Sequence, residues 1–217
     1  MDSYPRPQFK RTEWLSLNGV WSCCIDNAES GMARGLAGSK GFDTPVRIPF
    51  CPESRLSGLE HTDFINSIWY HRRFAVPEHW AGKELILHFG GVDYECEVFI
   101  DGVSAGRHTG GAVSFELDVT PLLTAGKTHE LVVYAVDHIR SHLQCFGKQS
   151  VSYANEKANY TRTTGIWSDV WLEPVSSGGL RFCCIISDYD GGTFIFRPSF
   201  RNVSAGNHFR IALYLSL

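Results

Sequence analysis

The stretch LILHFGGVDYECEVFIDG, residues 85–102, decides the fold class of this 217-residue chain. Apolar residues occupy every second position in its two halves: Leu85, Leu87 and Phe89, then Cys96, Val98 and Ile100. Side chains with this spacing lie on one face of a β-strand. The stretch ends on Asp101-Gly102, a dipeptide typical of a two-residue type I′ turn. It therefore predicts two strands, the second of which opens a hairpin.

The same alternation continues on both sides of this stretch. One set is Phe115, Leu117 and Val119, and another is Leu131, Val133 and Ala135. Further strands are expected at residues 20–25, 46–50, 69–76 and 170–174. Convincing helical periodicity is absent. Many short strands without intervening helices predict an all-β domain, which can be a sandwich, a jelly roll or a barrel.

Composition and charge exclude several classes of protein. Hydrophobic residues make up 43% of the chain and charged residues 20%, the balance of a soluble globular protein. No stretch approaches the ~18 apolar residues of a membrane-spanning helix, so no membrane partner is expected. The net charge is −3 and dense Lys/Arg runs are missing, which disfavours nucleic acid. The first residues lack the apolar segment of a signal peptide, so we expect a cytoplasmic protein.

Seven cysteines, at positions 23, 24, 51, 96, 145, 183 and 184, follow neither a disulfide pattern nor a zinc-binding one. Neighbouring residues on a strand point to opposite faces, so the pairs Cys23-Cys24 and Cys183-Cys184 cannot easily bridge. CxxC spacing is absent, and neither a metal nor a cofactor is expected. We interpret the cysteines as small buried hydrophobic residues in a reduced compartment.

A joint of small residues, Ser176-Ser177-Gly178-Gly179, divides the chain. We place one domain at residues 1–176 and a second at 177–217. Three strand-like runs follow the joint, at 180–187, 193–200 and 209–217. A complete sandwich of this kind needs about seven strands, so three leave an open hydrophobic face and a raw edge. We therefore expect the polypeptide to continue beyond Leu217, and a homo-oligomer is one way to cover the edge.

The strand pattern fails for about thirty residues between His138 and Trp167. Connections of that length are uncommon in compact domains and often carry function. This one mixes aromatic residues with amide and cationic ones: Phe146, Lys148, Gln149, Tyr153, Asn155, Asn159, Tyr160, Arg162 and Trp167. Such a mixture suits a hydroxyl-rich ligand such as a sugar. A long loop packed on a neighbouring domain is the alternative, and composition favours neither.

Three motifs resemble the N-terminal domain of family 2 glycoside hydrolases. The first runs from PRPQ at residues 5–8 to LNGVW at 17–21. The second runs from LHFGGVDY at 87–94 through VFIDG at 98–102 to GRHTGG at 106–111. The third, and the most specific, is YTRTTGIW at 160–167 followed by VWLE at 170–173. The resemblance covers residues 5–176, and the chain from Leu180 resembles the start of the family's second, immunoglobulin-like domain.

The resemblance implies an enzyme of three parts: a jelly roll with a galactose-binding-like β-sandwich, an immunoglobulin-like sandwich and a TIM barrel. The family is retaining, and both of its catalytic glutamates lie on the barrel. The chain is therefore expected to be the non-catalytic, sugar-binding region of an exo-β-glycosidase of the β-galactosidase/β-glucuronidase kind. Its expected partners are a β-glycoside and its own C-terminal barrel. The parent hydrolyses O-glycosidic bonds, whereas the chain alone is expected to be inactive.

Asn159 is the first residue that the resemblance singles out. In several family members, the side chain six residues before the Gly-Ile pair reaches into the barrel's active site and binds sugar hydroxyls or an ion. In this sequence that position is Asn159. Relatives often have Asp there. An Asp carboxylate only accepts hydrogen bonds, whereas Asn also donates, which makes an ion site less expected.

Arg162 is the second candidate for contact with substrate. It can bind the sugar directly, or it can orient the loop through an ion pair with a loop carboxylate. Of these two roles, the sequence favours the ion pair. Trp21, Trp69, Trp167 and Trp171 are expected to be core aromatic residues.

Two further pairs of residues have the spacing of a site. Glu95 and Glu97 share a strand face, and a retaining glycosidase needs two carboxyl groups about 5–5.5 Å apart. We interpret them, together with Asp93, as a solvated strand face. His138 and His142 have the i, i+4 spacing of metal ligands on a helix, but the segment does not read as a helix.

Two other functions stay open from the sequence. The chain can be a free-standing, lectin-like module that binds carbohydrate without cleaving it. It can also be a purely structural domain.

Overall fold

A computed structural model describes residues 3–203, 206 and 208 of the chain. The chain forms two compact units, Met1–Pro174 and Val175–Leu217. The sequence placed the boundary between residues 176 and 177, at the small-residue joint. Each unit is described by itself.

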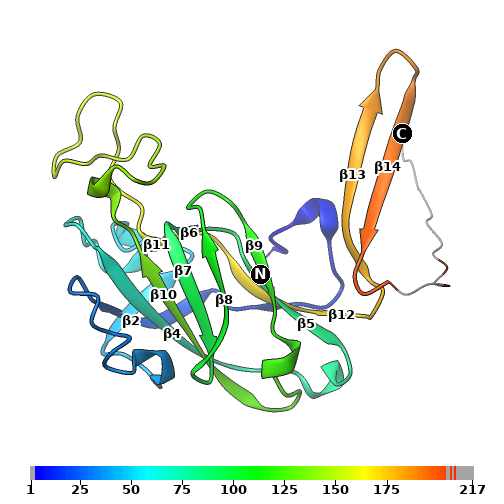
Figure 1. Cartoon of the computed structure of the whole chain (residues 1–217), viewed down its shortest axis with the longest axis horizontal. Helices are drawn as coiled ribbons and strands as arrows, with labels where there is room; N and C mark the ends of the chain where they lie inside the picture. Colours follow the sequence, from blue (N-terminus) through cyan, green and yellow to red (C-terminus); the bar gives the residue numbers. More distant parts are fainter. Residues whose placement is uncertain (1–2, 204–205, 207, 209–217) are drawn as a thin grey trace. The chain divides into compact units, whose positions relative to one another are not determined.

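The first unit is built from two antiparallel-paired β-sheets (Figure 1). The six-stranded sheet has the order β3 (Thr44–Ile48), β2 (Gly19–Ile25), β4 (Ser67–Ala75), β10 (Thr128–Val136), β7 (Glu95–Ile100) and β8 (Val103–Thr109). The four-stranded sheet has the order β1 (Leu15–Ser16), β12 (Val170–Val175), β5 (Glu84–Phe89) and β9 (Phe115–Asp118). A short pair joins β6 (Val92–Asp93) to β11 (Gly165–Ile166). The predicted all-β sandwich is confirmed.

The described residues contain no α-helix, only short 3-10 turns. These turns are Pro7–Phe9, Leu36–Gly38, Arg55–Ser57, Glu78–Trp80, Thr120–Leu122 and Ile139–Ser141. No helix in this part of the chain has the length and apolar character needed to cross a membrane.

The hairpin between β7 and β8 follows the predicted turn chemistry. Asp101 has φ 49° and Gly102 has φ 81°, so both central residues adopt the positive φ that a type I′ turn requires. The Asp101 carboxylate also accepts from the backbone N–H of Glu130 at 2.8 Å and lies 2.6 Å from Nδ1 of His129. The turn is thereby tied to the neighbouring strand β10.

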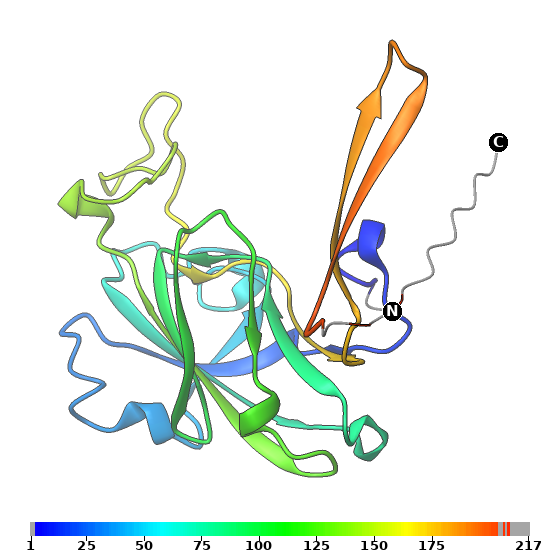
Figure 2. The same ribbon diagram turned by 45° about the vertical axis from the view of Figure 1, so that its right-hand side comes forward.

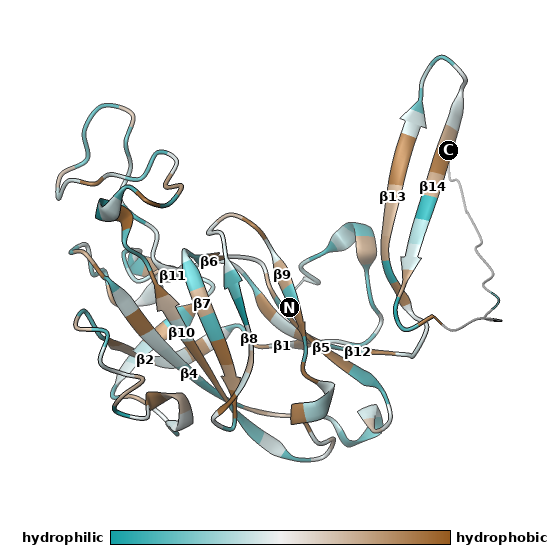
Figure 3. Cartoon of the chain, viewed as in Figure 1, coloured by the Kyte–Doolittle hydropathy of each residue, from teal (hydrophilic) through white to brown (hydrophobic). Residues whose placement is uncertain are grey.

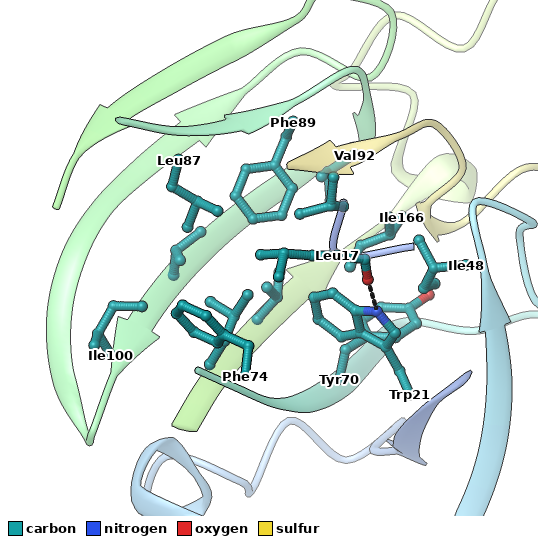
Figure 4. Close-up of a cluster of buried hydrophobic side chains, with 14 of the residues drawn as sticks. Leu17, Trp21, Ile48, Tyr70, Phe74, Leu87, Phe89, Val92, Ile100 and Ile166 are labelled. Atoms are coloured by element: carbon teal, nitrogen blue, oxygen red, sulfur yellow. Dashed lines mark hydrogen bonds between the residues drawn. The ribbon is translucent and has the colours of Figure 1, made fainter. Parts of the chain in front are cut away.

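The core lies between the two sheets and contains the alternating residues of the sequence analysis. Leu87 and Phe89 from the four-stranded sheet meet Ile100 and Phe74 from the six-stranded sheet (Figure 4). Tryptophan 21 completes this cluster, and its indole N–H donates to the carbonyl of Leu17 at 2.7 Å. Figure 3, coloured by hydropathy, shows hydrophobic residues along β4 and β10.

The outer face of the four-stranded sheet is covered by the N-terminal segment. Glu173 of β12 is buried there, and it accepts hydrogen bonds from the Tyr4 hydroxyl and from the Trp171 indole at 2.7 Å. Arg11 and His88 lie 3.4 and 3.3 Å from its second oxygen. Burial alone would raise the pKa of Glu173, but the hydrogen bonds and charge of His88, with Tyr4 and Trp171, lower it to about 2.

The second unit is described as one hairpin, β13 (Leu180–Asp188) with β14 (Thr193–Phe200). Its two strands match the predicted runs 180–187 and 193–200. Apolar side chains are exposed on it: Phe182, Ile185, Ile186, Tyr189, Phe194 and Ile195. The third predicted run, 209–217, lies outside the described residues. The immunoglobulin-like identity of this unit and a homo-oligomer stay predictions.

Two expectations about burial were partly wrong. Trp21, Trp69 and Trp171 are buried as predicted, but Trp167 is 37% exposed and lines a pocket described below. All seven cysteines are free, yet only Cys23 and Cys96 are buried, and Cys145 is exposed on the long loop.

Truncation of a core side chain tests this packing. Leu87→Ala removes a fully buried side chain between the sheets, so we expect the free energy of unfolding to fall by about 2–5 kcal/mol in urea denaturation. Leu143→Ala is the matched control, because Leu143 is 91% exposed and its loss should change stability by less than about 0.5 kcal/mol. Equal effects of the two substitutions would contradict the assigned core.

Candidate functional site

The candidate site is built on the long loop, residues 137–164, which connects β10 to β11. The loop extends from one end of the sandwich in both ribbon views (Figures 1 and 2). Among its described residues, no strand forms, and its only β-type pairing is an isolated parallel bridge between Gln149 and Tyr160. The sequence therefore located this loop correctly from the failure of its strand pattern.

Backbone hydrogen bonds give the loop internal order. The N–H of Tyr160 donates to the carbonyl of Lys148 at 2.8 Å, and the N–H of Ser150 donates to the carbonyl of Tyr160 at 2.7 Å. Nearer the tip, the Asn155 side-chain amide donates to the Thr161 hydroxyl at 3.1 Å. The two arms of the loop are thus held side by side, immediately next to Asn159.

Three buried carboxyl groups lie where the loop joins the sandwich, and we refer to Glu53, Asp93 and Asp137 as the root carboxyls. Each one accepts a hydrogen bond from the loop. Asp93 accepts from the Gln149 amide at 2.7 Å. Asp137 accepts from the Gln144 amide at 2.6 Å and from the Thr164 hydroxyl at 3.0 Å. Glu53 accepts from the backbone N–H of Thr164 at 3.2 Å.

Burial changes the acidity of all three root carboxyls. Desolvation raises the pKa of Asp93, and the nearby charges of Asp137 and Glu53 raise it further, to about 7, against the hydrogen bond from Gln149. Desolvation also raises the pKa of Glu53 and of Asp137, although Gln144 and Thr164 oppose the change at Asp137. Below about pH 7, Asp93 therefore holds a proton that an exposed carboxyl group would have released.

Two glycines allow the close packing around the root carboxyls. A Cβ atom at Gly111 would overlap the Asp93 carboxyl group. Gly165, which pairs with Asp93 between β11 and β6, has φ 69°, and a Cβ there would overlap the Tyr70 hydroxyl. Both positions need glycine because the backbone approaches buried polar groups directly.

Arg162 is buried, with 3% of its surface exposed, and it holds the base of the loop. Its guanidinium donates to the carbonyl of Ser152 at 2.9 Å and to the carbonyl of Thr62, and it lies 4.1 Å from the centre of the Phe64 ring. These partners are backbone carbonyls and an aromatic ring rather than the loop carboxylate that the sequence analysis considered. Its charge also lowers the pKa of Asp137. Contact between Arg162 and substrate stays a prediction.

Asn159 is exposed and lies beside the bridge formed by Tyr160. Its backbone N–H donates to the carbonyl of Glu156 at 3.0 Å. Within the described residues, its side chain forms no hydrogen bond, so the amide is free to meet a ligand. The structure brings Asn159 and Arg162 onto one ordered loop but gives them different surroundings, one exposed and one buried.

A pocket of about 580 Å³ opens between the loop and the sandwich. Its lining residues include Asp93, Tyr94, Gly111, Phe146, Gln149 and Trp167. The Trp167 ring is held in place because its indole N–H donates to the Gly111 carbonyl at 2.7 Å. A pocket of this size, with aromatic walls and a few polar groups, is of the kind that holds small organic ligands.

Sequence reasoning missed the role of Asp93. We interpreted Asp93, Glu95 and Glu97 as one solvated face, and this is wrong for Asp93, which is 5% exposed. The cause is a partner that strand alternation cannot reveal, namely Gln149, which lies 56 positions away. Glu95 is exposed, and Glu97 forms an ion pair with Arg107 at 2.8 Å.

The two histidines weighed as metal ligands have other surroundings. His138 forms a pair with Glu29 at 3.1 Å, and His142 follows a single 3-10 turn with φ 59°. Among the described residues, no group of three or more His, Cys, Asp and Glu side chains is arranged to hold a metal ion.

These features define a β-sandwich module with one long, anchored loop at its end. The family model described as glycosyl hydrolases family 2, sugar binding domain, matches residues 21–174. The chain belongs to glycosyl hydrolase family 2, which confirms the resemblance that the three motifs indicated.

Curated relatives are similar over part of the chain. A β-galactosidase of Thermoanaerobacter pseudethanolicus is 31% identical over 105 residues, which cover 48% of this chain and 13% of that protein. A β-glucuronidase of Paenibacillus borealis is 26% identical over 131 residues, which cover 60% of this chain and 22% of that protein. The chain thus matches less than a quarter of the length of either relative.

Solved structures share the fold. A β-glucuronidase of Ruminococcus gnavus in complex with C6-substituted uronic isofagomine has a TM-score of 0.72 at 19% identity, covering 95% of this chain and 36% of that one. A β-glucuronidase of an uncultured Clostridium sp. has a TM-score of 0.70 at 22% identity, covering 92% of this chain and 35% of that one.

The raised pKa of Asp93 predicts that stability falls between pH 5 and pH 8. Its pKa is about 7 in the folded chain and 3.8 without the fold, so between these values the folded state holds a proton that the unfolded state has lost. The stability from this proton is complete below pH 3.8 and is lost as the pH rises through 7. We expect a loss on the order of 2–4 kcal/mol, measured by urea denaturation at both pH values.

Asp93→Asn isolates this effect, because Asn keeps an oxygen to accept from Gln149 but cannot ionise. The variant should show a smaller fall in stability between pH 5 and pH 8 than the unmodified chain. Glu97→Gln, which removes a carboxyl group from the outer strand face, should keep the full fall. The same fall in the chain and in Asp93→Asn would contradict the buried, protonated state of Asp93.

Proposed function

We propose that this chain is the non-catalytic, sugar-binding region of a retaining exo-β-glycosidase of the β-galactosidase/β-glucuronidase kind. The parent hydrolyses O-glycosidic bonds of a β-glycoside. Its two catalytic glutamates lie on a C-terminal TIM barrel outside this chain. The family match over residues 21–174 carries the proposal, and the names of the relatives, β-galactosidase and β-glucuronidase, indicate the substrate class.

The role proposed for the chain is to present the loop to the sugar. Asn159 stands six residues before Gly165-Ile166. The family resemblance implies that, in several members, the side chain at this position reaches the active site. Asn159 is exposed on a loop whose base is held by buried Arg162, so the side chain is accessible while the loop that carries it is anchored. Its amide can donate to one sugar oxygen and accept from a second hydroxyl. Arg162 anchors the base of the same loop through its hydrogen bonds to the carbonyls of Ser152 and Thr62.

The chain by itself is proposed to have no hydrolytic activity. A retaining mechanism needs two carboxyl groups free to act as nucleophile and as acid/base. Glu97 is bound to Arg107 and accepts from the Ser104 hydroxyl at 2.7 Å. The root carboxyls are buried and bonded to the loop. We also propose a cytoplasmic location, consistent with the free cysteines.

Replacing Asn159 in the full-length protein tests the proposed contact. Asn159→Ala would leave a substrate hydroxyl without a partner in a closed site, which costs about 1–3 kcal/mol. We expect kcat/KM on an aryl β-glycoside to fall roughly tenfold to a hundredfold, with little change in Tm, since the side chain is exposed. Asn159→Asp should have a milder effect, because a carboxylate still accepts.

Asn155→Ala is the matched control for this measurement. Asn155 is an exposed amide on the same loop, and its side chain already pairs with Thr161. Its replacement should leave kcat/KM within about threefold of the unmodified enzyme, since it removes only the exposed pairing of Asn155 with Thr161. Small and equal effects of the two alanine substitutions would contradict the proposed contact and leave the loop a structural element.

A further inference from the structure

Gln149 joins both arms of the long loop to the sandwich. Its side-chain amide donates to Asp93 of β6 at 2.7 Å, and its side-chain oxygen accepts from the backbone N–H of Thr163 at 2.7 Å. On either side of it, the backbone of Lys148 and Ser150 bonds to Tyr160. One side chain therefore connects the outgoing arm, the returning arm and the fixed strand.

We propose that Gln149 and Asp93 are positioning residues that set the placement of Asn159, and that the charge of Asp93 controls how firmly they do so. This inference rests on the proposed function for the contact of Asn159 with sugar. Its structural part, the control of loop order by Gln149 and Asp93, concerns this chain alone and can be tested without any substrate.

The path from Gln149 to Asn159 is short. Gln149 and Tyr160 form the only bridge among the described residues of the loop, and Asn159 directly precedes Tyr160. Without the Gln149 side chain, the bridge would keep its backbone bonds but lose its link to Asp93 of β6 and its link to the Thr163 backbone. Arg162 would still hold the base of the loop through Ser152 and Thr62, so the sandwich should remain folded.

The surroundings of Asp93 explain why its charge matters. Its Oδ2 atom accepts from Gln149, whereas its Oδ1 atom has no hydrogen-bond partner among the described residues. The carboxyl groups of Asp137 and Glu53 lie near Asp93, and their negative charges oppose its ionisation. Asp137 in turn faces the His138 imidazole and the Arg162 guanidinium, and Glu53 faces the Cys51 thiol. Arg162 is the buried cation of this group, so a fully ionised cluster carries more negative than positive charge.

Ionisation of Asp93 should therefore loosen the root of the loop. Like charges brought together in a buried site repel each other strongly, because little water screens them. The repulsion separates Asp93 from Asp137 and Glu53, and these three groups are the acceptors that hold Gln149, Gln144 and Thr164. The loop is thus expected to be better ordered at pH 5.5 than at pH 8.

The first experiment measures hydrogen exchange in the 217-residue chain. Gln149→Met keeps the length of the side chain but removes both hydrogen bonds. We expect the protection of the Ser150, Tyr160 and Thr163 amides to fall tenfold or more, while the core amides of β10 keep theirs. Asn155→Ala, which breaks a hydrogen bond of the same loop without touching β6, should change the three amides by less than about threefold.

The second experiment follows the same amides with pH. Exchange is corrected for its intrinsic dependence on pH. In the unmodified chain, protection should be several-fold lower at pH 8 than at pH 5.5, and in Asp93→Asn it should be nearly constant. Asp93→Leu, which offers no acceptor to Gln149, should be poorly protected at both pH values. The contrast between Asp93→Asn and Asp93→Leu separates the role of Asp93 as a hydrogen-bond acceptor from the role of its charge.

The third experiment is a double-mutant cycle in the full-length protein. If Gln149 acts by placing Asn159, then Gln149→Met should lower kcat/KM several-fold on its own. It should have little further effect in the Asn159→Ala background. A side chain that only stabilises the fold would give the same loss in both backgrounds.

The outcomes separate the two claims. A loss of kcat/KM in Asn159→Ala that simply multiplies with the loss in Gln149→Met would overturn the inference and leave the proposed function intact. No loss in Asn159→Ala would overturn the proposed function, while the exchange data would still decide the control of the loop. Unchanged protection of the loop amides in Gln149→Met would contradict the proposal that Gln149 orders the loop. Equal pH dependence of this protection in the unmodified chain and in Asp93→Asn would contradict the proposed role of the Asp93 charge.

Discussion

The buried contact between the root carboxyls and the long loop is the interaction on which the candidate site depends. The loop has no sheet pairing of its own apart from one bridge, so its shape comes from what it bonds to beneath. Gln144, Gln149 and Thr164 give it fixed points on Asp137, Asp93 and Glu53. Asp93 lies on β6 and Asp137 directly follows β10, so these two carboxyl groups are attached to strands of the closely packed sandwich.

Such an arrangement carries an energetic cost. Removing a carboxylate from water costs several kcal/mol unless it is paired or neutralised. Both pairing and neutralisation occur in this cluster. Arg162 supplies a positive charge near Asp137, and burial raises the pKa of Asp93 to about 7. Glu173, on the outer face of the four-stranded sheet, is the opposite case, since hydrogen bonds and charge lower its pKa to about 2.

The fold could be predicted from the sequence because its signals are local. Alternation at Leu85, Leu87 and Phe89 marks a strand that buries one face, and Asp101-Gly102 marks a turn that needs positive φ. The place of the loop also followed from the missing alternation. The site could not be predicted to the same degree, because its contacts join distant segments. Asp93 is separated from Gln149, and Trp167 from Gly111, by more than fifty residues, and no spacing rule connects them.

A structure of the full-length protein with a bound β-glycoside tests the central claim most directly. The account predicts that the Asn159 side chain lies within about 2.7–3.2 Å of a sugar oxygen, with Gln149 still bonded to Asp93 beneath it. A sugar bound with Asn159 in solvent, or with the loop packed only against a neighbouring domain, would contradict it.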